Sequence, residues 1–513
     1  MMKIIVPLAG ENGQFQTEFN AIKPLVDICG RSMVELACDM FPSDSHFIFI
    51  CKDSDLDTNA LRAALQGLPY RVSITALSFT PSSLLDTLCE ANDLMQADDE
   101  FIILHPDSIS QFSFTEFISQ VRLNKAAAAL TTFKGFTPFD LNGNDYCRVT
   151  IDEEFVISLI EKSPLRQGQV TAAGVYYFSL WGVFLADARE SLKNQSQVNG
   201  RYFEADVFNQ IIRRGGTVVH YPVGTFLNFG SPEYVSEYKF WLRYFSNLTL
   251  PNENDHRSTR EMSVLIPAAG LGKRFADEGY LKPKPLIDVF GRPMIVSSAM
   301  ALPKGTEYIF VVLEEHCKQF GLDQVLFNSL PNCTSVTLRE PTQGMACTCL
   351  MAAHLLAPKK PLLVSSCDYS FVYDDQRFGA LLDAESPDAV IFTFRRYPDA
   401  RLAPLAYAYL VLGVDGRVER VSEKVPVSDE PHNDHVVQGV FYFKSAELFE
   451  QSATEMIRKK NSVNGEYYVA TAINELIERG CKVLPFEVDQ YICWGTPLDL
   501  RTFEFYKRIF SSL

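Results

Sequence analysis

A glycine-rich turn and an arginine follow an apolar run in the second half of this 513-residue chain. Residues 267–274 read PAAGLGKR, so Gly270 and Gly272 come directly after the run and just before Arg274. Glycines let backbone N–H groups approach a triphosphate closely, and an arginine can neutralise its charge. Taken alone, the turn is equally typical of an ordinary connection between a strand and a helix.

A lysine between two prolines follows this turn. Residues 282–286 read KPKPL and precede the strand-like segment IDVFGRPMI. Because proline fixes φ and limits the freedom of the loop, Lys284 is a pre-positioned point charge at the edge of the same site. The two motifs together predict a site for a small phosphate compound.

The same pattern occurs twice in the chain. The segment IIVPLAGENGQFQTEFNAIKPLVDICGRSM, from Ile4, matches VLIPAAGLGKRFADEGYLKPKPLIDVFGRPM, from Val264. Later segments follow in the same order: FIILHPDS answers LLVSSCDYS, ISLIEKSP answers ERVSEKVP, AAGVYYFS answers VQGVFYFK, VNGRYFEA answers VNGEYYVA, and NFGSPEY answers CWGTPLD. The chain therefore contains two homologous copies of one domain.

The elements that must position these residues alternate along each copy. Short apolar runs, such as residues 47–50, 309–313 and 362–365, alternate with helix-like stretches such as residues 345–356. This alternation predicts an α/β fold with a mostly parallel sheet and with ligands at the carboxyl ends of its strands. We expect domains over residues 1–246 and 261–513, joined by a polar linker at 247–260.

The glycine turn with its arginine, followed by PKPL and GRPM, resembles the sugar-phosphate nucleotidyltransferases, or NDP-sugar pyrophosphorylases. The resemblance is closest to the branch of bacterial capsule and lipopolysaccharide biosynthesis and covers nearly all of residues 262–513. It implies two tandem Rossmann-like domains of the nucleotide-diphospho-sugar transferase (GT-A-like) type. It also implies a Mg²⁺-dependent transfer of NMP from an NTP to a sugar 1-phosphate, giving an NDP-sugar and pyrophosphate.

The resemblance assigns roles to residues of the second copy. Arg274 and Lys284 match the catalytic cations, and Asp368 matches the metal-binding aspartate. The residues that match nucleotide-binding positions are Ala269, Gly270, Gly272, Gln343, Gly344 and Ala346, and those that match sugar-phosphate-binding positions are Glu423, Lys424 and Gly439.

One position departs from the family pattern. Many members have a second metal aspartate two residues before the final glycine, where this chain has Cys493. Asp499 would replace it only if the loop curled back. Either one aspartate holds the metal together with the substrates' phosphates, or the activity is weaker than is usual in the family.

These roles agree with the chemistry of nucleotidyl transfer. The reaction needs in-line placement of a phosphate oxygen and neutralisation of charge at the α-phosphate. Lysine, arginine and a hard cation supply that neutralisation when two polyanions meet. A sugar phosphate is already ionised, so no general base is required.

The first copy keeps only part of the pattern. Gln14 stands where the second copy has Arg274, and residues 81–84 answer the TQGMA segment without a glycine. The positions that persist are Gly10, Lys23, Asp107, Glu161 and Lys162. We expect this copy to be catalytically degenerate and to serve assembly or effector binding; a second active site with another substrate is the alternative.

Composition and charge narrow the class of protein. With 47% hydrophobic and 21% charged residues the chain is typical of a globular protein, and its net charge of −16 argues against a nucleic-acid partner. The N-terminal residues read as a strand rather than a signal peptide, and no run reaches the ~18 apolar residues of a membrane span. We expect a cytoplasmic protein, without membrane insertion, whose twelve scattered cysteines are reduced. The resemblance implies homo-oligomers, with NTP and sugar phosphate as ligands.

Three other functions stay open from sequence. One is a cytidylyltransferase that acts on a polyol phosphate. Another is a glycosyltransferase, although its usual Asp-x-Asp motif is replaced by Asp368-Tyr369-Ser370. The third is a non-catalytic regulatory protein, which the intact glycine turn of the second copy argues against. The sequence leaves the base and the sugar undetermined.

Overall fold

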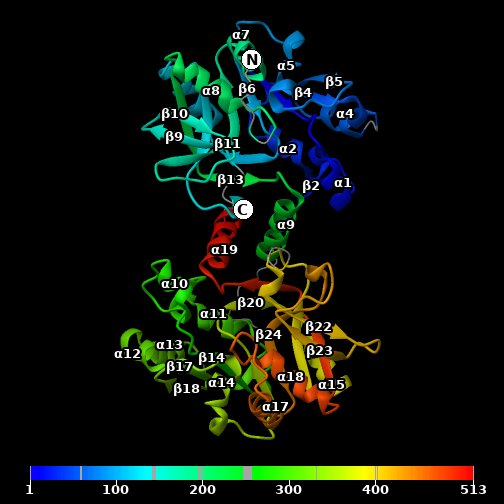
Figure 1. The fold of residues 1–513 in the computed structure, drawn as a ribbon, viewed down its shortest axis with the longest axis vertical. Helices are drawn as coiled ribbons and strands as arrows, with labels where there is room; N and C mark the ends of the chain where they lie inside the picture. The colour runs from blue at the N-terminus through cyan, green and yellow to red at the C-terminus, as the bar shows by residue number, and fades with distance from the viewer. Residues whose placement is uncertain are drawn as a thin grey trace. The chain divides into compact units, whose positions relative to one another are not determined.

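The computed structural model describes residues 2–511, except for residues 58–59, 141–145, 194–197, 199, 247–256, 331, 399 and 401–402. The chain divides into two compact units (Figure 1). Unit 1 comprises Met1–Phe245 and Phe505–Leu513, and unit 2 comprises Ser246–Glu504. Unit 1 contains the first copy of the repeat and unit 2 the second. Both are α/β, which confirms the fold class predicted from the alternating pattern.

Unit 1 is built on a mixed nine-stranded sheet among its described residues. The strands, in spatial order, are β5 (Arg71–Leu77), β4 (His46–Lys52), β1 (Lys3–Pro7), β6 (Phe101–Leu104), β11 (Gln169–Phe178), β8 (Ala128–Phe133), β12 (Val218–Val223), β10 (Phe155–Ile160) and β9 (Arg148–Asp152). The first four strands pair in parallel, whereas β11 runs antiparallel to both neighbours.

Helices cover both faces of this sheet because its central strands are apolar on both sides. Ile5 faces a core that includes residues of α5 (Leu84–Cys89), α7 (Trp181–Lys193) and α8 (Glu204–Arg213). The neighbouring Ile4 faces the opposite core, which includes residues of α2 (Met33–Cys38), α3 (Asp53–Leu56), α4 (Ala60–Gln66) and α6 (Phe114–Leu123). Unit 1 also contains α1 (Gly13–Phe19), the one-turn helix η1 (Lys23–Leu25) and α9 (Pro232–Ser246).

Unit 2 repeats this sheet. Its main path is β18 (Cys333–Leu338), β17 (Gly305–Leu313), β14 (Arg260–Ala268), β19 (Leu362–Val364), β24 (Val436–Phe443), β21 (Ala389–Phe394) and β25 (Val483–Glu487). Off this path, β22 (Ala408–Leu412) pairs with β24, and β23 (Val418–Glu423) pairs with β22. The first four strands are again parallel, and β24 is antiparallel to β19 and β21. The two sheets therefore share one topology, as the internal repeat predicted.

Helices also cover the sheet of unit 2. One face packs against α14 (Met345–Leu350), α17 (Ala446–Arg458) and α18 (Val469–Glu478). On the other face, Phe378 of α15 (Asp375–Glu385) contacts Phe392 at 5.0 Å between ring centroids. Unit 2 also contains α10 (Lys273–Asp277), η4 (Lys284–Leu286), α11 (Met294–Ala301), α12 (Glu314–Phe320) and α13 (Leu322–Ser329).

A short antiparallel ladder crosses the carboxyl end of each sheet. In unit 1 it joins β7 (Ser108–Gln111) to β13 (Thr225–Asn228), and in unit 2 it joins β20 (Tyr369–Val372) to β26 (Gln490–Cys493). In each unit this ladder brings the last glycine motif of the copy to the mid-domain aspartate.

The sequence boundary between the two units lies next to the predicted linker. Residues 247–256 of the predicted linker lie outside the described residues, and Arg260 opens β14. Helix α19 (Pro497–Phe510) is divided between the units, because its residues from Phe505 onward group with unit 1. There Tyr506 stacks on Trp241 at 5.4 Å. None of the described helices combines the length and apolarity that a bilayer crossing requires.

Candidate active site

The glycine turn of unit 2 lies directly against the proline-flanked lysine. Ala269 is buried after the end of β14, Gly270 is exposed, and Gly272 begins α10 with a left-handed φ of 60°. A Cβ at Gly272 would lie 3.0 Å from Cβ of Lys284. The glycine therefore allows both the turn and its close approach to Lys284.

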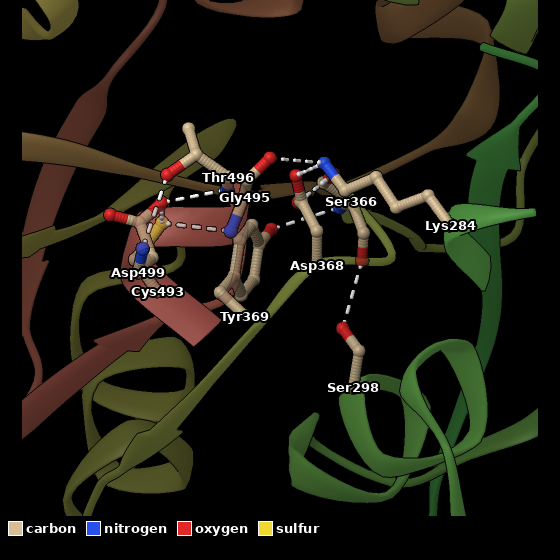
Figure 2. A network of polar contacts seen from close by, with 9 residues as sticks. All are labelled: Lys284, Ser298, Ser366, Asp368, Tyr369, Cys493, Gly495, Thr496 and Asp499. Carbon is tan, nitrogen blue, oxygen red and sulfur yellow. Dashed lines mark hydrogen bonds and ion pairs between the residues drawn. The ribbon is translucent and has the colours of Figure 1, made fainter. Parts of the chain in front are cut away.

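Lys284 ties three segments together at the carboxyl end of the sheet (Figure 2). Its Nζ lies 2.5 Å from Oδ2 of Asp368 and donates to the carbonyl oxygen of Gly495 at 2.9 Å. The hydroxyl of Ser366 donates to the other oxygen of Asp368 at 2.5 Å. Sequence reasoning missed Ser366, because a serine two residues from an aspartate carries no signal of its own.

Burial and pairing oppose each other in setting the charges of this ion pair. Burial alone raises the pKa of Asp368, but the charge and hydrogen bond of Lys284, with Ser366, bring that pKa below its ordinary value. Burial likewise lowers the pKa of Lys284, but Asp368 raises it above its ordinary value. Both groups are therefore charged at neutral pH.

The Asp499 carboxylate accepts a hydrogen bond at the N-terminus of a helix. Its Oδ2 accepts from the backbone N–H of Thr496 at 2.8 Å, while its own N–H donates to the Thr496 hydroxyl at 3.2 Å. This reciprocal pattern caps the N-terminus of α19. The Cys493 thiol also donates to the same Oδ2, at 3.4 Å. The chain thus turns back as the sequence would require, but this carboxylate is already committed to capping.

The donor atoms around Asp368 fit a hard divalent cation that is held largely by substrate phosphates. Mg²⁺ is usually bound through one or two carboxylates, with waters and phosphates completing its shell. Asp368 supplies such a carboxylate. Burial, followed by the charges of Asp499 and Asp368, raises the pKa of the Cys493 thiol well above its ordinary value, so Cys493 stays protonated and is a poor ligand.

The segment predicted to bind the nucleotide is hydrogen-bonded to the backbone of Tyr467, which is distant in sequence. The N–H of Tyr467 donates to the carbonyl of Gln343 at 2.9 Å, and the N–H of Ala346 donates to the carbonyl of Tyr467 at 3.0 Å. Gly344, at φ 112°, begins α14, and a Cβ there would lie 2.6 Å from the Tyr467 nitrogen. Gln343 is exposed, whereas the Ala346 side chain is fully buried and its N–H is taken by Tyr467.

The residues predicted to bind the acceptor, a sugar phosphate, lie at the end of β23 and on β24. Lys424, at φ 58°, places Nζ 5.2 Å from the ring centroid of Tyr468. Burial raises the pKa of Glu423 to about 7, against the charge of Lys424 and with that of Glu466. Gly439 has φ 103°, and a Cβ there would lie 3.2 Å from the ring of Tyr369.

Two residues beside this acceptor group escaped the sequence interpretation. The Tyr468 hydroxyl donates to Oε2 of Glu466 at 2.5 Å, and both lie in the repeated segment VNGEYYVA. The available signal was a difference between the two copies, because the first copy has Arg201 and Phe203 at these positions.

Arg274 stands apart from these contacts. It lies in α10 with an exposed side chain, and no residue of the described chain forms a hydrogen bond or ion pair with it. Arg274 follows Gly272, which packs on Lys284, by two residues.

Unit 1 keeps the central ion pair. Lys23 Nζ lies 2.5 Å from Asp107 Oδ2 and 3.3 Å from the carbonyl of Gly230. Asn228 occupies the position of Cys493, and its Oδ1 accepts from the N–H of Gly230 at 2.6 Å. The other retained positions are exposed Gly10 after β1, half-buried Glu161 after β10 and exposed Lys162, at φ 49°.

Known families match both units. Residues 19–226 match the nucleotidyl transferase family model, and residues 264–423 match the model of the MobA-like NTP transferase domain. The chain therefore consists of two nucleotidyltransferase domains in tandem.

Several solved structures are similar to about half of the chain, while no curated relative matches it. A nucleoside-diphosphate-sugar pyrophosphorylase from Vibrio cholerae RC9 is 21% identical over 47% of this chain and 98% of its own, with a TM-score of 0.39. A UDP-glucose pyrophosphorylase from Acinetobacter baumannii is 16% identical over 48% and 94%, with a TM-score of 0.37. The inositol-1-phosphate CTP transferase from T. maritima is 14% identical over 48% and 96%, with a TM-score of 0.37.

Proposed function

We propose that unit 2 transfers NMP from an NTP to a sugar 1-phosphate and releases an NDP-sugar and pyrophosphate. The observation that carries this proposal is the glycine turn with Arg274, which unit 1 lacks, lying against Lys284 where this lysine contacts Asp368 and Gly495. This arrangement combines a cation, a carboxylate and the backbone of a glycine turn at the carboxyl ends of parallel strands, where ligands of such sheets bind.

The nucleotide side of the site neutralises and orients the triphosphate. The backbone of Ala269, Gly270 and Gly272 approaches the phosphates, and Arg274 with Lys284 offsets their charge. The nucleoside lies along the segment from Gln343 to Ala346, which is held in place by Tyr467. Since the transition state accumulates charge on phosphate oxygens, fixed cations contribute most of the catalysis.

A Mg²⁺ ion is the cofactor of this reaction in our proposal. Asp368 would hold it, and the ion supplies charge neutralisation between the two anionic substrates. The ion pair with Lys284, and then the hydrogen bond from Ser366, keep the Asp368 carboxylate ionised.

The acceptor side binds a sugar 1-phosphate. Glu423 accepts sugar hydroxyls, Lys424 pairs with the phosphate, and the bare backbone at Gly439 leaves room for the ring. No side chain has to remove a proton, because the attacking phosphate oxygen is already ionised. The chain's task on this side is orientation, which can supply several kcal/mol of the barrier reduction.

The wider setting follows from the same proposal. The NDP-sugar would supply surface polysaccharide biosynthesis, the enzyme would act in the cytoplasm, and the chain would assemble into homo-oligomers. Unit 1 would not turn over nucleotides, because Gln14 replaces the arginine and Ser83 replaces Gly344.

Pyrophosphate release by the purified full chain tests this function. The four common NTPs are assayed with Mg²⁺ against sugar 1-phosphates and polyol phosphates. We expect one NTP and one sugar 1-phosphate to react, and Lys284→Ala and Asp368→Ala to abolish release. Lys282→Ala, two residues away and exposed, is the matched control. Release with a polyol phosphate alone would change the acceptor class, and silence across the panel would refute the proposal.

A further inference from the structure

The turn that carries Asp368 is joined to its sheet differently from the matching turn of unit 1. In unit 1 the pairing of β6 with β11 extends to Leu104, and the N–H of His105 then donates to the carbonyl of Gly174 at 2.9 Å. In unit 2 the pairing of β19 with β24 ends at Val364, one residue before the position that matches Leu104. The turn of unit 2 therefore leaves the sheet earlier.

The Tyr369 side chain stands where unit 1 has that direct contact between two strands. The N–H of Ser366, which matches His105, donates to the Tyr369 hydroxyl at 2.9 Å (Figure 2). The same hydroxyl shares a hydrogen bond with the Ser365 hydroxyl at 3.0 Å. The tyrosine ring lies against Gly439 of β24, where a Cβ would come within 3.2 Å of it. Tyr369 thus bridges the turn and the strand from which the turn has separated.

The sheet itself does not require this tyrosine. Unit 1 forms the same strand order with Ser108 at the matching position, and there a Cβ on Gly174 would lie only 2.3 Å from the serine Cβ. That spacing leaves no room for an aromatic ring. Tyr369 is 4% exposed, and a buried tyrosine hydroxyl usually finds a hydrogen-bond partner. Its partners belong to the turn that carries Asp368, so the tyrosine acts on that turn.

The turn in unit 2 is held through three groups of Ser366. Its N–H is bound by Tyr369, its carbonyl accepts from the Ser298 hydroxyl at 3.0 Å, and its own hydroxyl donates to Oδ1 of Asp368 at 2.5 Å. In unit 1 the matching oxygen of Asp107 is 3.4 Å from the hydroxyl of the next residue in the chain. Only unit 2 therefore holds its aspartate by a short bond from a serine that is itself fixed on both sides.

We propose that Tyr369 is a positioning residue for the metal-binding aspartate. Its ring keeps the ends of β19 and β24 apart, and its hydroxyl holds Ser366 where the serine can orient Asp368. An ionised carboxylate has about four lone-pair sites, so the oxygens bound by Ser366 and Lys284 can still bind a cation. The role of Tyr369 rests on the function proposed for unit 2, because it concerns a cation at Asp368.

Two substitutions separate the hydroxyl from the ring. Tyr369→Phe keeps the ring against Gly439 and removes the partner of the Ser366 N–H, whereas Tyr369→Ser introduces the residue of unit 1 and removes both. Outer hydrogen bonds around a metal ligand are typically worth tenfold to a hundredfold in metal affinity, so we expect roughly a tenfold loss for phenylalanine and roughly a hundredfold loss for serine. Binding of NTP without metal should not change, because the cations and the glycine turn remain.

Calorimetric titration of the full chain with each common NTP, in Mg²⁺ and again in EDTA, measures the metal's contribution to binding. No turnover interferes, because no sugar phosphate is present. We expect the affinity in Mg²⁺ to fall by the factors above while the affinity in EDTA stays the same. When sugar phosphate is added, Tyr369→Phe should raise the Mg²⁺ concentration for half-maximal pyrophosphate release and leave the KM for the sugar phosphate unchanged.

A second tyrosine of the same sheet provides the control. Tyr442 lies on β24 and packs on Phe378 at 6.1 Å between ring centroids, so Tyr442→Phe changes a tyrosine that does not touch the turn. We expect this variant to bind Mg²⁺ and NTP as the parent does. Thermal unfolding of every variant verifies that unit 2 is folded.

Three results would overturn the role of Tyr369. The first is a contribution of Mg²⁺ that both Tyr369 variants leave unchanged. The second is an equal loss in Mg²⁺ and in EDTA, which would make the tyrosine a general support of the unit. The third is a parent chain that binds no NTP in Mg²⁺ and releases no pyrophosphate. Only this third result would also refute the function proposed for unit 2.

Discussion

The two units hold the same central contact and differ around it. Lys23 in unit 1 and Lys284 in unit 2 each lie 2.5 Å from an aspartate and bond a glycine carbonyl. Where the nucleotide would bind, however, unit 1 has Gln14 instead of Arg274 and Ser83 instead of Gly344.

The difference shows what the shared contact means. A lysine that joins a loop, a strand end and the last glycine motif stabilises the fold whether or not a nucleotide is turned over. The ion pair by itself is therefore weak evidence of catalysis. The residues that separate the two units are the better markers of activity, and each can be moved from one unit to the other.

Removing the shared lysine should have the largest effect, and only in unit 2. Lys284→Ala takes away a cation aimed at the transferring phosphate and should lower kcat/KM for pyrophosphate release roughly thousandfold. Lys23→Ala should lower it at most about threefold. Steady-state kinetics of the two variants, with circular dichroism to verify folding, measure the contrast. Equal losses would show that both units take part in the reaction.

Exchanging the arginine should come next. Arg274→Gln gives unit 2 the residue of unit 1 and should lower kcat/KM roughly a hundredfold, because one charge on the triphosphate is left without its partner. If the charge acts in the transition state, kcat should fall as well, and saturating NTP should not restore the rate. A variant that loses only NTP affinity would move Arg274 from catalysis to binding.

The fold and the repeat could be predicted because they depend on local signals. Apolar runs of strand length, the glycine turn and the proline-flanked Lys284 can each be read within a few residues. The contact of Lys284 with Asp368 spans 84 residues, yet the common order of motifs in both copies already placed them in one site.

Other contacts had no sequence signal. The partner of Lys284 at Gly495 is a backbone carbonyl, which any residue would provide. The pair of His105 and Glu204 joins segments from opposite halves of unit 1, and each residue alone looks ordinary. The α19 residues that group with unit 1 read as the end of the second copy, because sequence order does not show which core an aromatic side chain enters.

The nucleotide loop offers a third and smaller test. Ser83 of unit 1 is an ordinary helix cap at φ −155°, whereas Gly344 needs φ 112° and leaves no space for a Cβ against Tyr467. Gly344→Ser should therefore push the segment away from Tyr467, raise the KM for NTP roughly tenfold and lower the melting temperature of unit 2. Ser83→Gly should barely change stability. An unaltered KM would mean that this loop does not contact the nucleotide.

The matched carboxyls Glu423 and Glu161 should give the smallest effect, which is a change in the pH dependence of stability. The pKa of Glu423 is raised from 4.5 to about 7, and that of Glu161 from 4.5 to about 8, in both cases chiefly by burial. Between pH 4.5 and the raised value the unfolded chain loses a proton that the folded unit keeps, so stability falls as pH rises and levels off above it.

Glutamine variants remove this loss, so the advantage of Glu423→Gln should grow up to about pH 7 and that of Glu161→Gln up to about pH 8. We expect roughly 1 kcal/mol, or about 2–4 °C in the melting transition of each unit. Calorimetric scans from pH 5 to 9 measure both windows in one chain. Parallel curves for the variants and the parent would show that the two carboxyls ionise normally, and coincident windows would erase the difference between the two units.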